Sequence, residues 1–288
     1  MTTWGRVLRP MVTVGALLLA LSSLAVAAPP QTVRFPSADG QTELIGYLFL
    51  PAGGGRHPAV VLLHGRAGPY SSLAHGVYTA QTLSKRHEFW GELWAKRGFV
   101  TLLVDSFGPR GYWQGFPRGS YDERPSAVSE QTVRPLDAYG GLAYLRSRSD
   151  VMPDHVGLQG WSNGAMTALV TMSTRAPGIN GPSPETGFRA ALVFYPGCGM
   201  AAVKGAYAPY APIQMFVGTA DEEVSAERCQ TWESGVKSRG GTIDLVAYPG
   251  AEHDFDDPGK TKQSRPPNAA ATQDAIRRSE AFFDQHLR

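Results

Sequence analysis

The sequence predicts one α/β domain built on a mostly parallel β-sheet of about eight strands, with helices on both faces. Short, continuous apolar runs recur along the chain, and stretches with the apolar spacing of helices separate them. Continuous apolar runs are typical of strands that are buried on both faces of a parallel sheet. Neither an internal repeat nor a long linker divides the 288 residues, so we expect a single sheet to organise the fold.

The strands are expected where these apolar runs lie. Residues 32–35 and 44–50 are predicted to form an antiparallel pair that turns at Asp39 and Gly40, because Asp-Gly is a common hairpin turn. The parallel strands are expected at residues 59–63, 100–104, 156–158, 190–194, 213–217 and 243–247.

Two helices and two loops stand out between and after the strands. Residues 136–144 and 276–287 place apolar side chains on one face, at the spacing of an amphipathic helix. Residues 106–135 and 177–187 are rich in proline and glycine, and we expect them to form loops over one edge of the sheet.

Residues 1–27 are predicted to be a signal peptide. Arg6 and Arg9 precede an apolar run, which ends in the small residues Ala25 and Ala27 that suit signal peptidase. An uncleaved membrane anchor is the alternative, but the run is short, two serines interrupt it and two prolines follow it.

We therefore expect cleavage after Ala27, which leaves residues 28–288 as one α/β domain without a stable membrane anchor. This domain would be exported, either to the periplasm or out of the cell. The whole chain has 27 basic and 25 acidic residues, and removing Arg6 and Arg9 leaves 25 of each. A neutral body without a basic cluster argues against nucleic acid as a partner.

Residues 160–164 read Gly-Trp-Ser-Asn-Gly and match the Gly-x-Ser-x-Gly pattern, which also occurs by chance in glycine-rich chains. Here the pattern follows a strand-like segment and precedes a helix-like one, which is the setting of a nucleophile elbow. The glycines leave room in such a tight turn because they have no Cβ atom. The sequence thus predicts that Oγ of Ser162 is exposed as a nucleophile at the carboxyl end of the sheet.

A serine hydroxyl needs a base to take its proton, and the chain has seven histidines. His253 lies in the loop directly after the last predicted strand, and Asp221 directly follows the preceding strand. The order Ser162, Asp221, His253 is the chain order of the triad on α/β-hydrolase sheets. We expect Asp221 to orient His253, with Glu222 and Glu223 as alternative carboxylates.

The oxyanion of an acyl-transfer reaction needs hydrogen-bond donors. Residues 62–68 end the first core strand in a glycine-rich turn, and the backbone N–H of Arg66 or Ala67 is expected to pair with that of Asn163. His64 is expected to brace this turn. The sequence assigns only solvated or structural roles to His57, His75, His87, His286 and Asp254, the last of which is expected at the surface.

Aromatic side chains follow the strand at residues 100–104, and they either line an acyl or aryl pocket or pack the loop. Tyr112, Trp113 and Phe116 are the pocket candidates from this loop, together with Trp161, which is expected to pack below or beside the nucleophile. Phe107 and Tyr121 belong to the same aromatic group.

Cys198 and Cys229 are the two cysteines of the chain. An even number of cysteines in an exported chain favours a disulfide, and both residues follow neighbouring strands of the predicted sheet. The sequence thus predicts a Cys198–Cys229 bridge, with two separate buried thiols as the alternative.

The motifs also carry a family resemblance, which runs from about Thr32 to the C-terminus. The chain resembles the dienelactone hydrolase family of α/β-hydrolases in GWSNGA (160–165), GTADEEV (218–224), PGAEHDF (249–255), LLHGRAG (62–68) and VDSFGPRG (104–111). The founding members use cysteine as the nucleophile, whereas this chain has Ser162 in its place. The resemblance implies the fold and the triad but not the dienelactone substrate.

These observations predict an exported serine hydrolase that cleaves a small carboxylic ester or lactone. No cofactor is expected, and no metal, because no histidine or cysteine cluster has metal-ligand spacing. The alternatives are a polyester or acetyl-ester hydrolase, a peptidase on the same fold, or a non-catalytic binding protein.

Overall fold

The computed structural model describes residues 1–2, 4–5 and 29–288. The apolar run and the cleavage site of the predicted signal peptide lie outside the described residues. Within the described part of the chain, no helix is both long enough and apolar enough to cross a membrane.

The mostly parallel sheet predicted from the sequence is confirmed. Its eight strands have the order β1-β2-β4-β3-β5-β6-β7-β8. Strands β3 to β8 are parallel, whereas β2 pairs antiparallel with both β1 and β4. The strands are β1 (Gln31–Pro36), β2 (Glu43–Phe49), β3 (His57–Leu63), β4 (Val100–Asp105), β5 (Val151–Trp161), β6 (Ala190–Phe194), β7 (Ile213–Gly218) and β8 (Ile243–Tyr248).

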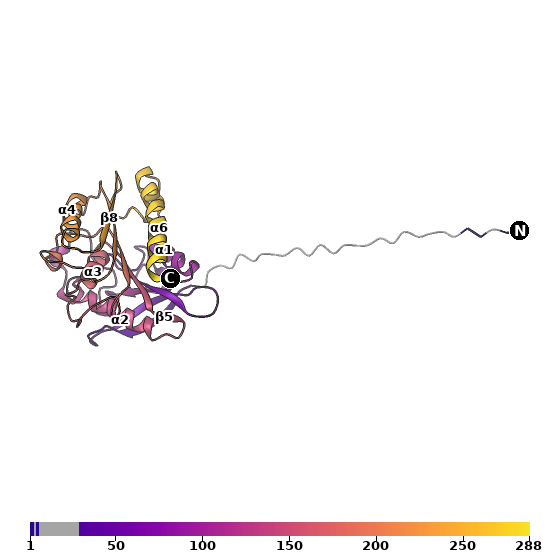
Figure 1. Cartoon of the computed structure of the whole chain (residues 1–288), viewed down its shortest axis with the longest axis horizontal. Helices are drawn as coiled ribbons and strands as arrows, with labels where there is room; N and C mark the ends of the chain where they lie inside the picture. The colour runs from indigo at the N-terminus through magenta and orange to yellow at the C-terminus, as the bar shows by residue number, and fades with distance from the viewer. Residues whose placement is uncertain (3, 6–28) are drawn as a thin grey trace.

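Helices cover both faces of the sheet (Figure 1). Helices α1 and α6 lie on one face, and α2, α3 and α4 lie on the other. The helices are α1 (Lys85–Lys96), α2 (Arg134–Arg146), α3 (Asn163–Thr171), α4 (Ala226–Lys237), α5 (Lys260–Gln263) and α6 (Pro266–Leu287). Short 3₁₀ helices are η1 (Ala80–Thr82), η2 (Gly108–Arg110), η3 (Tyr121–Glu123), η4 (Ser126–Val128) and η5 (Ala201–Val203).

Side chains of the central strands are buried alternately in the two layers. In β3, Val61 and Leu63 belong to the core under α2 and α3, whereas Val60 and Leu62 pack in the core that holds Trp90 of α1. All four aliphatic side chains are completely buried. A strand that is buried on both faces has no polar face, which explains its continuous apolar sequence.

Strand β5 is longer than the sequence predicts, because it begins at Val151 rather than near residue 156. Residues 152–155 are half-buried or exposed, and the pairing with β3 shifts register beside them. Pro153, Asp154 and His155 interrupt the apolar run between Val151 and Val156, so the sequence does not predict this part of the strand.

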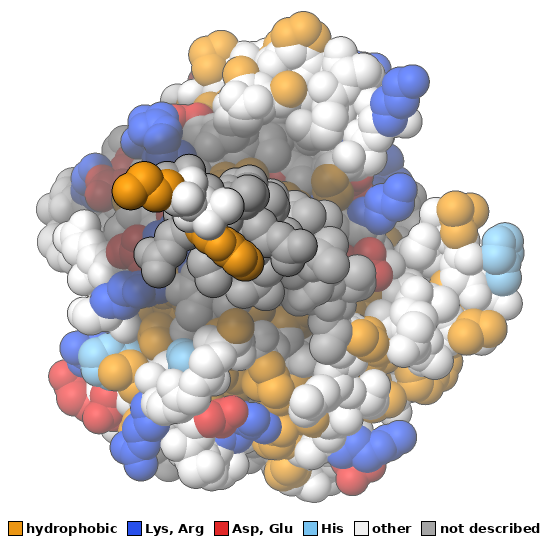
Figure 2. Space-filling model, turned by 90° about the vertical axis from the view of Figure 1, so that its right-hand side faces the viewer, with side chains coloured by type: hydrophobic (Ala, Val, Ile, Leu, Met, Phe, Trp, Pro, Cys, Tyr) orange, Lys and Arg blue, Asp and Glu red, His pale blue; other side chains and the backbone are white. Residues whose placement is uncertain are grey.

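The carboxyl ends of the parallel strands meet at one edge of the sheet, since the strands share one direction. Five segments therefore gather there: the turn at residues 64–68, Ser162, Tyr195, Asp221 and the loop that contains His253. On the uncovered part of the face in Figure 2, basic and acidic side chains lie interspersed without an extended patch of one sign.

Candidate active site

Ser162 occupies a sharp turn between β5, which ends at Trp161, and α3, which begins at Asn163. Its φ of 50° is positive, a strained conformation for a residue with a side chain. A Cβ atom on Gly160 would overlap with the backbone of Gly164, and one on Gly164 would overlap with the backbone at the end of β3. The glycines on both sides of Ser162 are therefore required by the close approach of the backbones.

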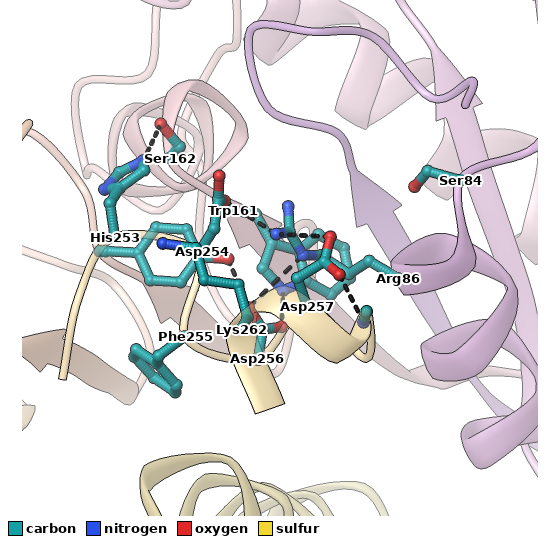
Figure 3. Close-up of polar contacts among 12 residues, drawn as sticks. Ser84, Arg86, Trp161, Ser162, His253, Asp254, Phe255, Asp256, Asp257 and Lys262 are labelled. Atoms are coloured by element: carbon teal, nitrogen blue, oxygen red, sulfur yellow. Dashed lines mark hydrogen bonds and ion pairs between the residues drawn. The ribbon is translucent and has the colours of Figure 1, made fainter. Parts of the chain in front are cut away.

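His253 lies between Ser162 and Asp221. Its Nε2 is 3.0 Å from Oγ of Ser162, and its Nδ1 is 2.8 Å from Oδ2 of Asp221. Figure 3 shows the imidazole of His253 turned toward the serine hydroxyl. The structure thus brings His253 together with Ser162 and Asp221, which precede it in the chain by 91 and 32 positions.

The two alternative carboxylates have other contacts. Glu222 accepts the backbone N–H of His253 at 3.3 Å, and Glu223 lies 3.9 Å from Nε2 rather than facing Nδ1. Asp221 is held in place by its own loop, because its Oδ1 accepts the backbone N–H groups of Glu223 and Val224. The geometry favours Asp221 as the partner of the imidazole.

The imidazole of His253 is almost completely buried, with only 1% of its side chain exposed. Burial opposes a charge on the ring, but the hydrogen bond to Asp221 and the nearby carboxylates of Asp254 and Glu223 outweigh burial. The pKa of His253 is therefore raised above its ordinary value. A base with a raised pKa takes a proton more readily from a hydroxyl.

Two backbone N–H groups are available beside Ser162. The N–H groups of Arg66 and Asn163 have no hydrogen-bond acceptor among the described residues, and both residues line the same cavity as Ser162. A Cβ built on Gly65 would lie 3.7 Å from Cβ of Ser162, so the glycine-rich turn packs directly against the elbow. This arrangement fits an oxyanion hole.

A buried arginine that sequence reasoning missed connects these two segments. The guanidinium of Arg134 donates to the backbone carbonyl of His64 at 2.8 Å and to the side-chain oxygen of Asn163. The amide of Asn163 donates in turn to Glu130 at 3.1 Å. Complete burial lowers the pKa of Arg134 to about 10, which leaves the guanidinium charged at neutral pH.

The cavity beside Ser162 has a volume of about 490 Å³ and is rich in charged side chains. Arg66 forms an ion pair with Glu223 at 2.8 Å. Arg124 and Arg228 also line the cavity, and neither has a carboxylate within ion-pair distance among residues 29–288. The further lining residues are Arg118, Gly119, Tyr121, Met166, Gly197, Gly199, Met200, Glu222 and Val224.

Of the two alternatives for the aromatic candidates, the structure favours packing, because Tyr112, Trp113, Phe116 and Trp161 do not line the cavity beside Ser162. Trp161 is completely buried behind Ser162, and Trp113 stacks on Tyr78 with ring centroids 5.5 Å apart. Tyr112 and Phe116 pack against each other at 5.3 Å. Of the aromatic group in the loop, Tyr121 lines the cavity. No pattern in the sequence indicates which side of the loop faces Ser162.

The structure joins Cys198 to Cys229, with Cα atoms 5.1 Å apart. This distance suits a disulfide. The bridge fastens the segment after β6 to helix α4, and residues on both sides of it, Gly197, Gly199 and Arg228, line the cavity. The bridge therefore holds one wall of the cavity.

Other expected residues are structural. His64 is completely buried, with Nδ1 2.7 Å from the carbonyl of Gly65 and Nε2 accepting the N–H of Ser106, which fits a brace for the turn. His87 is buried rather than solvated, and burial lowers its pKa to about 3. Asp254 is not a free surface residue, because it pairs with Arg86. Among the described residues, no group of three or more potential ligands is placed to hold a metal ion.

Solved structures share this fold. Thermogutta terrifontis esterase 2, in a form phosphorylated by paraoxon, is 20% identical with a TM-score of 0.64 over 90% of this chain and 95% of that chain. A candidate dienelactone hydrolase from Klebsiella pneumoniae subsp. pneumoniae MGH 78578 is 17% identical with a TM-score of 0.65, covering 88% of this chain and 99% of the other. At these identities the likeness shows the fold.

Curated relatives match over a shorter segment. Human dipeptidyl peptidase 8 is 28% identical over 152 residues, which are 51% of this chain and 15% of that protein. The mouse protein of the same name is 27% identical and is covered to 16% of its length. This chain thus aligns with only a small part of these relatives.

The match at the level of the family is broader. The profile of the dienelactone hydrolase family matches residues 44–287, which include strands β3 to β8, all but the first residue of β2, and every site residue named above. The chain therefore belongs to the dienelactone hydrolase family.

Proposed function

We propose that the protein hydrolyses carboxylic esters or lactones through an acyl-enzyme on Ser162. The observation that carries this proposal is the continuous chain of contacts from Oγ of Ser162 through His253 to Asp221, at 3.0 and 2.8 Å. These distances are within hydrogen-bond reach, as activation of a hydroxyl by a general base requires.

The steps follow from these positions. Oγ of Ser162 attacks the carbonyl carbon while Nε2 of His253 takes the hydroxyl proton, and Asp221 keeps the other proton on Nδ1. The N–H groups of Arg66 and Asn163 receive the oxyanion, and each such donor contributes about 3–4 kcal/mol to the transition state. His253 then protonates the leaving alcohol, and water releases the acid by the same route in reverse.

The charges of the cavity support a preference among esters. Arg124 and Arg228 offer guanidinium groups without a carboxylate partner in the described part of the chain. Guanidinium groups bind carboxylates in a planar, often bidentate geometry. We propose that the preferred ester or lactone carries an anionic group near the scissile bond.

Export after cleavage of residues 1–27 is part of the proposal. It is supported by the Cys198–Cys229 bridge, because disulfides persist in oxidising compartments and are rare in the cytosol.

The proposal is tested with purified mature protein and a panel of esters and lactones of graded size and charge. Wild type should hydrolyse members of the panel, and Ser162→Ala should lower kcat by several orders of magnitude while it stays folded. Dipeptide amides belong in the panel because of the partial similarity to dipeptidyl peptidase 8. Cleavage of amides without cleavage of esters would favour a peptidase, and an active Ser162→Ala variant would exclude the serine mechanism.

A further inference from the structure

A buried carboxylate that the triad does not use lies behind the nucleophile (Figure 3). Asp256 follows His253 by three residues, and its side chain is completely buried. Its Oδ2 accepts hydrogen bonds from Nε1 of Trp90 and Nε1 of Trp161, each at 2.8 Å. Its Oδ1 accepts a hydrogen bond from the hydroxyl of Tyr195 at 2.5 Å. Burying a carboxylate is costly unless donors surround it, and here three side-chain donors do.

A single cation from α1 compensates the charge. Nε of Arg86 lies 3.4 Å from Oδ1 of Asp256, and the same guanidinium lies 2.9 Å from Asp254 and 3.5 Å from Asp257. Only 12% of the arginine side chain is exposed, so solvent screens these pairs weakly. Figure 3 shows Arg86 reaching from its helix to the acidic residues that follow His253. The histidine loop, residues 253–257, is thus fastened to α1.

The donors to Asp256 are neighbours of the reacting groups. Trp161 is the last residue of β5 and directly precedes Ser162. Tyr195 follows β6, and its ring centroid lies 4.6 Å from that of the His253 imidazole. One carboxylate therefore contacts both the residue that leads into the nucleophile and the ring that packs on the base.

Backbone strain is concentrated around the same carboxylate. Ser162, Tyr195 and Asp254 have φ angles of 50°, 42° and 59°. His75 is the one other non-glycine residue with a positive φ in the described part of the chain. Such conformations cost about 1–3 kcal/mol each and persist only where surrounding contacts hold them. The bonds to Asp256 supply such contacts at Tyr195 and at Trp161, the residue before Ser162, and Arg86 links Asp256 to Asp254.

We propose that Asp256 is a positioning residue that fixes the placement of the Ser162 hydroxyl relative to the His253 imidazole. It acts on the nucleophile's turn through Trp161 and on the imidazole through Tyr195. This inference rests on the proposed serine mechanism. Because a misplacement of reacting groups by about 1 Å can cost about 100-fold in rate, loosening this carboxylate should be visible in kcat.

Tyr195→Phe is the most specific test, because it keeps the ring that packs on His253 and removes only the hydroxyl that donates a hydrogen bond to Asp256. Tyr248→Phe is the matched control: its hydroxyl donates to Asp274 at 3.0 Å, and neither residue lines the cavity. We expect Tyr195→Phe to lower kcat about 10- to 100-fold with a nearly unchanged KM. Tyr248→Phe should keep the wild-type kcat even if its thermal midpoint falls.

Asp256→Asn provides the second test, because it keeps the shape of the side chain but sets amide hydrogens against hydroxyl or indole donors. It should lower kcat at least as much as Tyr195→Phe does. The loss of kcat in the double variant should be smaller than the two single losses combined, because both substitutions disrupt the same hydrogen bond between residues 195 and 256. If Asp256→Asn does not fold, Tyr195→Phe alone decides. Wild-type kcat per active site in Tyr195→Phe, accompanied only by a lower thermal midpoint, would overturn the proposal.

Titration with a fluorophosphonate counts the reactive serines in every sample, so that kcat refers to competent sites. A wild-type protein that does not react at Ser162 would overturn the serine mechanism itself. A wild-type protein that reacts at Ser162, with Tyr195→Phe and Asp256→Asn unchanged in kcat, would overturn only the role of Asp256.

Discussion

The carboxylate of Asp221 faces the imidazole of His253 with one oxygen while its own loop holds the other. Oδ2 lies 2.8 Å from Nδ1 of His253, and Oδ1 accepts the backbone N–H groups of Glu223 and Val224 at 2.8 and 2.9 Å. Rotation of the carboxylate would break these backbone bonds. Nδ1 of His253 therefore faces one fixed acceptor. This favours the tautomer with its proton on Nδ1 and its free lone pair on Nε2, which points toward Ser162.

Asp221→Asn should lower kcat by about 10⁴-fold, because an amide donor opposite Nδ1 favours the wrong tautomer of His253. Steady-state kinetics on the best ester of the panel measures this loss. Asp244→Asn, a change at an exposed carboxylate on β8, is the control and should be neutral. If Asp221→Asn keeps most of the activity while Glu223→Gln loses it, Glu223 holds the role instead.

The acid limb of the pH profile should report His253. Only the neutral imidazole accepts the serine proton, so kcat/KM should rise with pH through the pKa of His253 in the free enzyme. That pKa is raised, mainly by the hydrogen bond to Asp221 acting against burial, so the midpoint should lie above the ordinary value of about 6.5. In Asp221→Asn the midpoint should move down. A midpoint well below 6 in wild type would contradict the assignment.

The unpaired arginines of the cavity should determine charge preference. Arg124→Gln and Arg228→Gln should each raise KM about 10-fold for an ester that bears a carboxylate, since a charge-assisted hydrogen bond is lost. The KM for a neutral ester of equal length should change little. Arg34→Gln, at an exposed ion pair on β1, is the control. Equal losses for charged and neutral esters would show that the arginines shape the cavity rather than recognise an anion.

The disulfide should contribute measurably to stability. It closes a loop of 31 residues, which corresponds to about 3–4 kcal/mol on the chain-entropy estimate. Denaturant unfolding of the Cys198→Ser, Cys229→Ser double variant should show a decrease of this size in the free energy of unfolding. A reductant should destabilise wild type but leave the double variant unchanged. Two free thiols in protein purified without reductant would refute the bridge.

The main elements of the fold and the proposed triad could be predicted because their signals are local. Ser162, Asp221 and the histidine loop each follow a buried apolar strand, and parallel strands bring their carboxyl ends together. A residue's place after such a strand is visible in the sequence alone.

The supporting residues could not be predicted, because their roles depend on partners that are distant in the chain. Arg134 donates hydrogen bonds to Asn163 and His64, which lie 29 and 70 positions away in the chain, and no spacing pattern in the sequence predicts such contacts. The bonds to Asp256 come from Trp90 and Trp161, which are 166 and 95 positions away. The sequence leaves pocket lining and loop packing open for Tyr112, Trp113 and Phe116 for a related reason: the conformation of the loop decides which of its side chains face the cavity.

The proposed mechanism requires that Ser162 forms the covalent intermediate. This is tested by treating the protein with a fluorophosphonate and locating the adduct by mass spectrometry of its peptides, with residual ester hydrolysis measured in parallel. We expect one adduct, on the peptide that contains Ser162, whose formation matches the loss of activity and which is absent in Ser162→Ala. Loss of activity with the adduct on another residue, or full activity after complete labelling of Ser162, would contradict it.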